Sequence, residues 1–158
     1  MLHRVKKAHD ASHGKWIGVG GKCEDGESPD ECMVREVREE TGVQVQQWQY
    51  RGIVTFVSDR WENEYMHLFT ATKWEGNPDM SLNAEGELAW IAQRDLPLTE
   101  GKGDESISLW EGDKIFLRLL LNRETPFFSL KLVYCGDQMV GATLNGEPMD
   151  ITGQADGK

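Results

Sequence analysis

Three carboxylates, Glu36, Glu39 and Glu40, have the spacing of a cation-binding site. At positions i, i+3 and i+4 a helix brings them to one side. Like charges at this spacing repel by about 0.2 to 0.5 kcal/mol per pair, which a hard divalent cation would more than offset through oxygen coordination. Oxygen ligands alone favour Mg²⁺, with Mn²⁺ as a substitute, over zinc. Taken alone, such a trio of acids is more often a solvated helix face than a metal site. The residues around it must therefore distinguish the two interpretations.

The residues around the trio include a glycine-rich loop and one arginine. Gly20 and Gly21 let the backbone approach a metal closely, and the Gly20 carbonyl is a candidate further ligand. Arg35 is placed to pair with Glu27 and hold the loop against the helix, although such an arginine is most often a surface ion-pair residue. The carboxylates and the glycine-rich loop therefore form a candidate metal site, and the Arg35–Glu27 pair would hold its two parts together.

A helix is predicted to carry the carboxylates. Ser28 is a capping residue, Pro29 takes the first helical position and Glu31 the third, which together indicate a helix start. Gly42 supplies the stop. One face of this helix should pack on a core, leaving the acids at the edge of a cleft. The members of that face are Met33, Val34, Val37 and Thr41.

The rest of the chain alternates between strand-like and helical patterns. Gly136 and Asp137 form the expected turn of a hairpin, and Asp113 is the expected cap of a second helix. That helix has an apolar stripe of Ile115, Phe116, Leu119 and Leu120. Residues 16–19 form a short apolar segment. The predicted strands are 1–5, 50–57, 64–73, 87–91, 127–134 and 138–144, and the predicted second helix is 113–122.

Composition restricts the partners. The net charge of -10 opposes binding to a nucleic-acid polymer, because that affinity comes largely from Lys and Arg neutralising phosphates. A small anionic substrate remains compatible if a bound cation reverses the local field. Cys23, Cys32 and Cys135 are odd in number and form no C-x-x-C pair, which favours reduced thiols and a cytoplasmic location. We see no signal peptide or membrane span, so no membrane partner is expected.

The segment from Gly21 to Val43 resembles the Nudix box, G-x5-E-x7-R-E-U-x-E-E-x-G-U with U aliphatic, at every specified position. Seven fixed identities would match by chance in about one of 10⁸ windows. By this resemblance the chain is identified as a member of the Nudix family. The resemblance implies an α/β (α+β) fold, an α/β/α sandwich with a mixed central sheet. We expect one such domain over residues 1–145 and a polar tail, which frays, over 146–158.

The resemblance also implies roles for the box. Glu39 and Glu40 would bind the principal metal, and Glu36 would contact metal or orient the attacking water. Clustered carboxylates raise one another's pKa without a metal, so the general base is left open. The other members implied are a catalytic Arg35, a metal-binding Gly20, substrate-binding Gly21 and Lys22, and structural Gly21, Glu27 and Gly42.

Segments outside the box, at 14–22, 109–113, 127–128, 134 and 136–137, resemble the MutT-like 8-oxo-dGTP diphosphatases. In that group an acid ahead of a late strand is another metal ligand or base. Glu85, five residues before Trp90, occupies the matching place, and Glu87 is the competing candidate. The purine pocket of the group, an aromatic wall with a carboxyl group, points to Trp110 and Asp113. The alternatives are a core tryptophan and a helix-capping aspartate.

The expected activity is hydrolysis of an oxidised purine dNTP, such as 8-oxo-dGTP, to the monophosphate and pyrophosphate, a role in nucleotide-pool sanitation and DNA repair. ADP-ribose, dihydroneopterin triphosphate and capped RNA ends present a diphosphate to the same box, which does not discriminate among them. A non-catalytic nucleotide-binding module is the alternative of a different class. Such a module would be expected to lose box acids, and none is missing here.

The start of the chain, Met1 to Val5, resembles the second strand of its relatives rather than their first. The expectation is therefore that one strand of the sheet is missing. An unpaired edge exposes backbone donors and acceptors and invites pairing with a second copy, so a homodimer is one alternative. A version extended upstream is expected to be more stable, less prone to self-association and better at discriminating among nucleotides.

Overall fold

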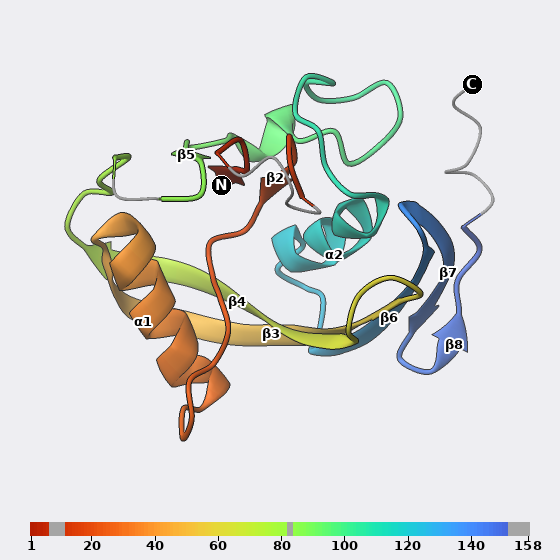
Figure 1. Cartoon of the computed structure of the whole chain (residues 1–158), viewed down its shortest axis with the longest axis horizontal. Coiled ribbons are helices and arrows are strands. Elements are labelled where there is room, and N and C mark those ends of the chain that lie inside the picture. The colour runs from red at the N-terminus through yellow and green to blue at the C-terminus, as the bar shows by residue number, and fades with distance from the viewer. Residues whose placement is uncertain (7–11, 82–83, 152–158) are drawn as a thin grey trace. The chain divides into compact units, whose positions relative to one another are not determined.

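The computed structural model describes residues 1–6, 12–81 and 84–151 of the 158-residue chain. The chain divides into two compact units (Figure 1). The first unit comprises Met1–Gln49 and Ala71–Trp110, and the second comprises Tyr50–Thr70 and Glu111–Lys158. The two longest strands, β3 (Gln44–Ser58) and β4 (Glu64–Glu75), each contribute residues to both units.

A small antiparallel sheet lies in the first unit, in the order β2-β1-β5. Its strands are β1 (Leu2–His3), β2 (Trp16–Ile17) and β5 (Glu87–Leu88). β1 and β5 are shorter than the sequence predicts, and β2 lies in the apolar segment 16–19. Leu2 is buried, and the adjoining Gly86 has to lack a side chain, because a Cβ there would lie 1.9 Å from the His3 carbonyl oxygen. The sheet thereby places the segment before β5 directly against β1.

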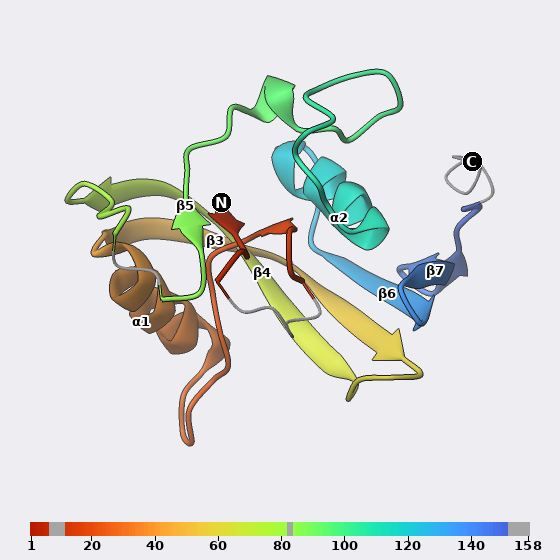
Figure 2. The same ribbon diagram turned by 45° about the horizontal axis from the view of Figure 1, so that its top comes forward.

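Helix α1 (Pro29–Thr41) begins and ends where the sequence predicts. The Ser28 hydroxyl accepts from the Glu31 amide, the Glu31 carboxylate accepts from the Ser28 amide, and Gly42 closes the helix with φ 73°. Trp48 of β3 donates from its indole to Asp30, so α1 lies beside the strand ends of its own unit (Figure 2). The predicted apolar face is only partly correct, because Cys32 and Thr41 are the buried residues of this helix.

A mixed five-stranded sheet has the order β4-β3-β6-β7-β8. Strand β6 (Phe128–Cys135) runs parallel to β3 and antiparallel to β7 (Gln138–Leu144). The expected mixed sheet and the hairpin around Gly136 are thus confirmed. Strand β8 (Glu147–Pro148) pairs with β7, so the sheet extends past the predicted boundary at residue 145. Backbone pairing keeps these two residues in the fold despite their polar sequence.

The core of the second unit is formed by Val54, Phe128, Leu130 and Leu132, all fully buried. Helix α2 (Glu111–Leu121) begins two residues earlier than predicted, so Asp113 lies in its first turn and is not its cap. Gly112 allows this start to approach β6, since a Cβ there would lie 2.4 Å from Leu132. The Gly112 amide donates to the Tyr134 hydroxyl at 2.8 Å.

The remaining helical element is η1 (Gln93–Asp95), a single 3₁₀ turn of the first unit. Among the residues that the structure describes, no helix has the length and apolar character to cross a membrane.

Candidate active site

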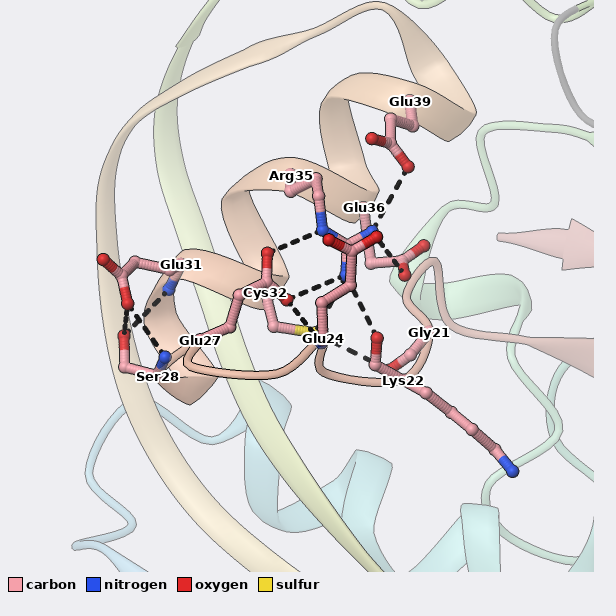
Figure 3. A network of polar contacts seen from close by, with 10 residues as sticks. All are labelled: Gly21, Lys22, Glu24, Glu27, Ser28, Glu31, Cys32, Arg35, Glu36 and Glu39. Carbon is pink, nitrogen blue, oxygen red and sulfur yellow. Dashed lines mark hydrogen bonds and ion pairs between the residues drawn. The ribbon is translucent and has the colours of Figure 1, made fainter.

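An ion pair joins the glycine-rich loop to helix α1. Arg35 donates from Nε and Nη2 to the two carboxylate oxygens of Glu27, at 2.7 and 2.9 Å, and from Nη2 to the Lys22 carbonyl at 3.0 Å (Figure 3). These bonds hold the pKa of Glu27 down at about 2 and raise that of Arg35. The pairing predicted between Arg35 and Glu27 is therefore present, and it fixes the loop on the helix.

The same guanidinium also gathers two of the three predicted carboxylates. Nη1 of Arg35 donates to Glu36 Oε1 at 2.8 Å and to Glu39 Oε2 at 3.2 Å. The Glu36 side chain is 16% exposed and that of Glu39 is 53% exposed, so one is enclosed and the other faces solvent. Both carboxylates therefore converge on one positively charged nitrogen of Arg35.

The two glycines of the loop lie against the carboxylates. The Gly20 amide donates to Glu40 Oε2 at 3.0 Å, and Gly20 has φ 152°, which L side chains rarely adopt. A Cβ on Gly21 would lie 2.4 Å from Glu36 Oε1. The loop backbone therefore lies against the acids, and a larger residue at Gly21 would displace Glu36.

The donor set fits an oxygen-seeking divalent cation. Within residues 1–6, 12–81 and 84–151, no three His, Cys, Asp or Glu side chains are already gathered as a metal site. However, Glu36 and Glu39 share one cationic atom, and Glu40 lies beside Gly20, whose carbonyl is the further candidate ligand. All these donors are oxygen atoms, which suits Mg²⁺ or Mn²⁺.

Glu85, the candidate fourth acid, forms an ion pair with Arg4. Its backbone carbonyl accepts from the Lys6 amide at 3.2 Å, so both side chain and backbone connect it to the segment after β1. Glu87, the competitor, is exposed and pairs in register with His3 within the small sheet.

Trp110 and Asp113, the predicted base-binding residues, belong to different units. Trp110 donates from its indole to Ser12 at 3.2 Å, and the Lys15 ammonium lies 5.2 Å from its ring centroid. Asp113 is half-buried in the first turn of α2. The Lys22 side chain extends away from the Arg35 network, although its carbonyl is bound within it (Figure 3).

A cleft of about 470 Å³ in the first unit was not predicted. His3 and Trp16 stack in its wall with centroids 4.6 Å apart, and Trp90 and two acids, Asp95 and Asp104, also line it. The pairing of β1 with β2 and β5 brings together His3, Trp16 and the segment that leads to Trp90, and a backbone hydrogen bond joins Asp104 to Asp95. The sequence offers no local signal for the cleft beyond its individual tryptophans.

Comparison with known proteins identifies the class. Residues 1–110 match the NUDIX domain family, which is more than half of the chain. The chain therefore belongs to the Nudix family, as the box predicts.

Two relatives and one solved structure place the chain within the family. It is 37% identical over 97 residues to "Uncharacterized Nudix hydrolase YvcI" of Bacillus subtilis, covering 57% of this chain and 61% of that protein. It is 30% identical over 113 residues to the oxidized purine nucleoside triphosphate hydrolase of Danio rerio, covering 70% and 65%. The chain thus spans less than two thirds of each of these relatives.

The crystal structure of a MutT protein from Bacillus halodurans has a similar fold. It superposes with a TM-score of 0.74 at 27% identity, over 93% of this chain and 89% of that one. This likeness extends well beyond the 110 residues of the family match.

Proposed function

We propose that this chain hydrolyses a phosphoanhydride bond of a nucleoside triphosphate, with an oxidised purine dNTP such as 8-oxo-dGTP as substrate. The convergence of Glu36 and Glu39 on one cationic atom, beside the Gly20 contact to Glu40, carries this proposal. Membership of the Nudix family supports the reaction class. The name of the Danio rerio relative supports the choice of nucleotide.

Mg²⁺, or Mn²⁺ in its place, would be held by Glu36, Glu39 and Glu40, with the Gly20 carbonyl and Glu85 as further ligands. When bound, such a cation polarises phosphoryl oxygens and lowers the pKa of bound water. Arg35 would keep the loop on α1 through Glu27 while its Nη1 gives up the shared carboxylates. The ion pair with Glu27 would thus keep Nε and Nη2 of Arg35, whereas the carboxylates released by Nη1 would bind the cation.

The remaining residues would hold the substrate. Gly21 and Lys22 would contact the pyrophosphate, because they adjoin the carboxylates on the same loop. Trp110 would stack on the purine and Asp113 would accept hydrogen bonds from the base edge. Monophosphate and pyrophosphate would be the products, and the role would be sanitation of a cytoplasmic nucleotide pool, as part of DNA repair.

A panel of substrates tests this proposal. The chain is assayed with Mg²⁺ on 8-oxo-dGTP, dGTP, ADP-ribose, dihydroneopterin triphosphate and capped RNA, with pyrophosphate and orthophosphate release measured separately. We expect pyrophosphate release, fastest from 8-oxo-dGTP. Equal rates on dGTP and 8-oxo-dGTP would contradict the sanitising role, and nucleotide binding without turnover on either Mg²⁺ or Mn²⁺ would contradict the enzyme itself.

A further inference from the structure

Two of the three cysteines lie in the loop and helix of the Nudix box. Cys32 is a buried residue of α1, and Cys23 is exposed in the loop before it. The Cys32 thiol donates to the Gly21 carbonyl at 3.8 Å and accepts from Arg35 Nη2, also at 3.8 Å. Cys32 therefore contacts both the loop and the arginine that holds it (Figure 3).

The backbone on both sides of Cys23 is anchored to the same network. The Lys22 carbonyl accepts from Arg35 at 3.0 Å, and the Glu24 amide donates to Glu27 Oε2 at 2.8 Å. Cys23 therefore adjoins the loop residues that contact Cys32 and Arg35, and it lies close enough to Cys32 for its thiol to contribute to the raised pKa of Cys32. Two thiols that are close in sequence and lie on neighbouring parts of one loop and helix need little chain movement to bond.

The two thiols differ in reactivity. Burial, followed by the hydrogen bond with Cys23, raises the pKa of the Cys32 thiol to about 12. Cys32 is thus a poor nucleophile toward solvent, whereas Cys23 is exposed to it. This asymmetry is the arrangement of an attacking cysteine and a resolving cysteine.

We propose that Cys23 and Cys32 form an intramolecular disulfide, a modification site that links the glycine-rich loop to α1. With hydrogen peroxide as oxidant, the Cys23 thiol first loses its proton to solvent and the thiolate attacks one peroxide oxygen. The O–O bond breaks to give a sulfenic acid and hydroxide, and the hydroxide takes up the released proton to form water. The Cys32 sulfur then attacks the Cys23 sulfur, the S–O bond breaks, and the thiol proton leaves with the hydroxyl as a second water. Two thiols and one peroxide give one disulfide and two waters.

This disulfide and the Arg35–Glu27 ion pair would both connect the glycine-rich loop to α1, so each would hold the loop on the helix. Loss of the ion pair should therefore cost less stability in the oxidised protein than in the reduced protein. Closing the short ring should also stabilise the fold, with a rise of about 5 to 10 °C in thermal midpoint.

Peptide mapping of the whole chain tests the bond. After treatment with one equivalent of hydrogen peroxide, we expect the intact mass to fall by two hydrogen atoms and one peptide to link Cys23 to Cys32, both reversed by dithiothreitol. Cys23→Ser should abolish the linked peptide. Cys135→Ser is the matched control, since Cys135 is also exposed but lies in the second unit, and it should leave the linkage unchanged. A linkage through Cys135, or none, would overturn the proposal.

Thermal denaturation tests the consequence. The drop in midpoint caused by Glu27→Gln is measured with and without peroxide, in wild-type and Cys23→Ser backgrounds. We expect the drop to shrink at least twofold on oxidation in the wild-type background and to stay unchanged in the Cys23→Ser background. A drop of equal size in the reduced and oxidised wild-type backgrounds would show that the disulfide does not support this loop, and would refute the structural link.

Discussion

At the scale of single residues, one guanidinium organises the box. Arg35 contacts Glu27, Glu36 and Glu39 together with the Lys22 carbonyl. Its bidentate pairing with Glu27 needs a planar group with several donors, which lysine does not provide. The arginine therefore fixes the loop on the helix and brings two carboxylates to one of its nitrogens.

The Arg35–Glu27 pair predicts an acid-sensitive component of stability. The hydrogen bonds from Arg35 lower the pKa of Glu27 in the folded state to about 2, below the ordinary value of 4.5 for a glutamate. A carboxylate with a depressed pKa contributes stability above its unfolded pKa, and this contribution is lost as the pH falls toward the folded value. Thermal midpoints between pH 6 and pH 2 should show that Glu27→Gln is less stable than wild type near neutrality and that the gap narrows on acidification. A constant gap would contradict this.

Glu40 predicts a loss of function without a loss of fold. Glu40→Gln should lower Mg²⁺-dependent turnover by at least about a hundredfold, because a neutral amide is a weaker ligand for a hard cation. Removing one of three neighbouring negative charges should leave the metal-free midpoint unchanged or slightly raised. The control is Glu124→Gln at an exposed turn of the second unit. An active Glu40→Gln protein with wild-type metal dependence would remove Glu40 from the ligand set.

At the scale of elements, helix α1 depends on its caps. Ser28→Ala removes the acceptor for the Glu31 amide and should cost about 1 kcal/mol, a fall of roughly 2 to 4 °C in thermal midpoint. Ser129→Ala on the exposed face of β6 deletes the same hydroxyl and should have little effect. Equal losses from the two substitutions, measured by thermal denaturation, would show that the cap is not the cause.

At the scale of the whole molecule, metal binding should stabilise the fold. A ligand that binds only the folded state adds about 2.7 kcal/mol at a hundred times its Kd, which corresponds to a rise of roughly 5 to 10 °C in midpoint. We expect this rise with Mg²⁺ and Mn²⁺, and a smaller one in Glu39→Gln and Glu40→Gln. An identical rise in wild type and both variants would place the cation elsewhere.

The sequence by itself determined helix α1, the Arg35–Glu27 pair and the family. These features are local: a cap, a stop and an ion pair lie within a few turns of one another, so residue type and spacing define them. The hairpin around Gly136 follows for the same reason. The helix start at Glu111 was missed, because the approach of Gly112 to Leu132 and Tyr134 favours an earlier start than the aspartate cap indicates.

Only the tertiary structure decided which distant residues meet. Pairing of β1 with β5 places Glu85 beside Arg4, and pairing of β1 with β2 stacks His3 on Trp16 in the cleft. The burial of Cys32, and its contact with the Gly21 carbonyl, likewise depend on how the loop folds back over α1. Strand register and loop closure join residues that are remote in the chain, and sequence spacing alone does not encode such contacts.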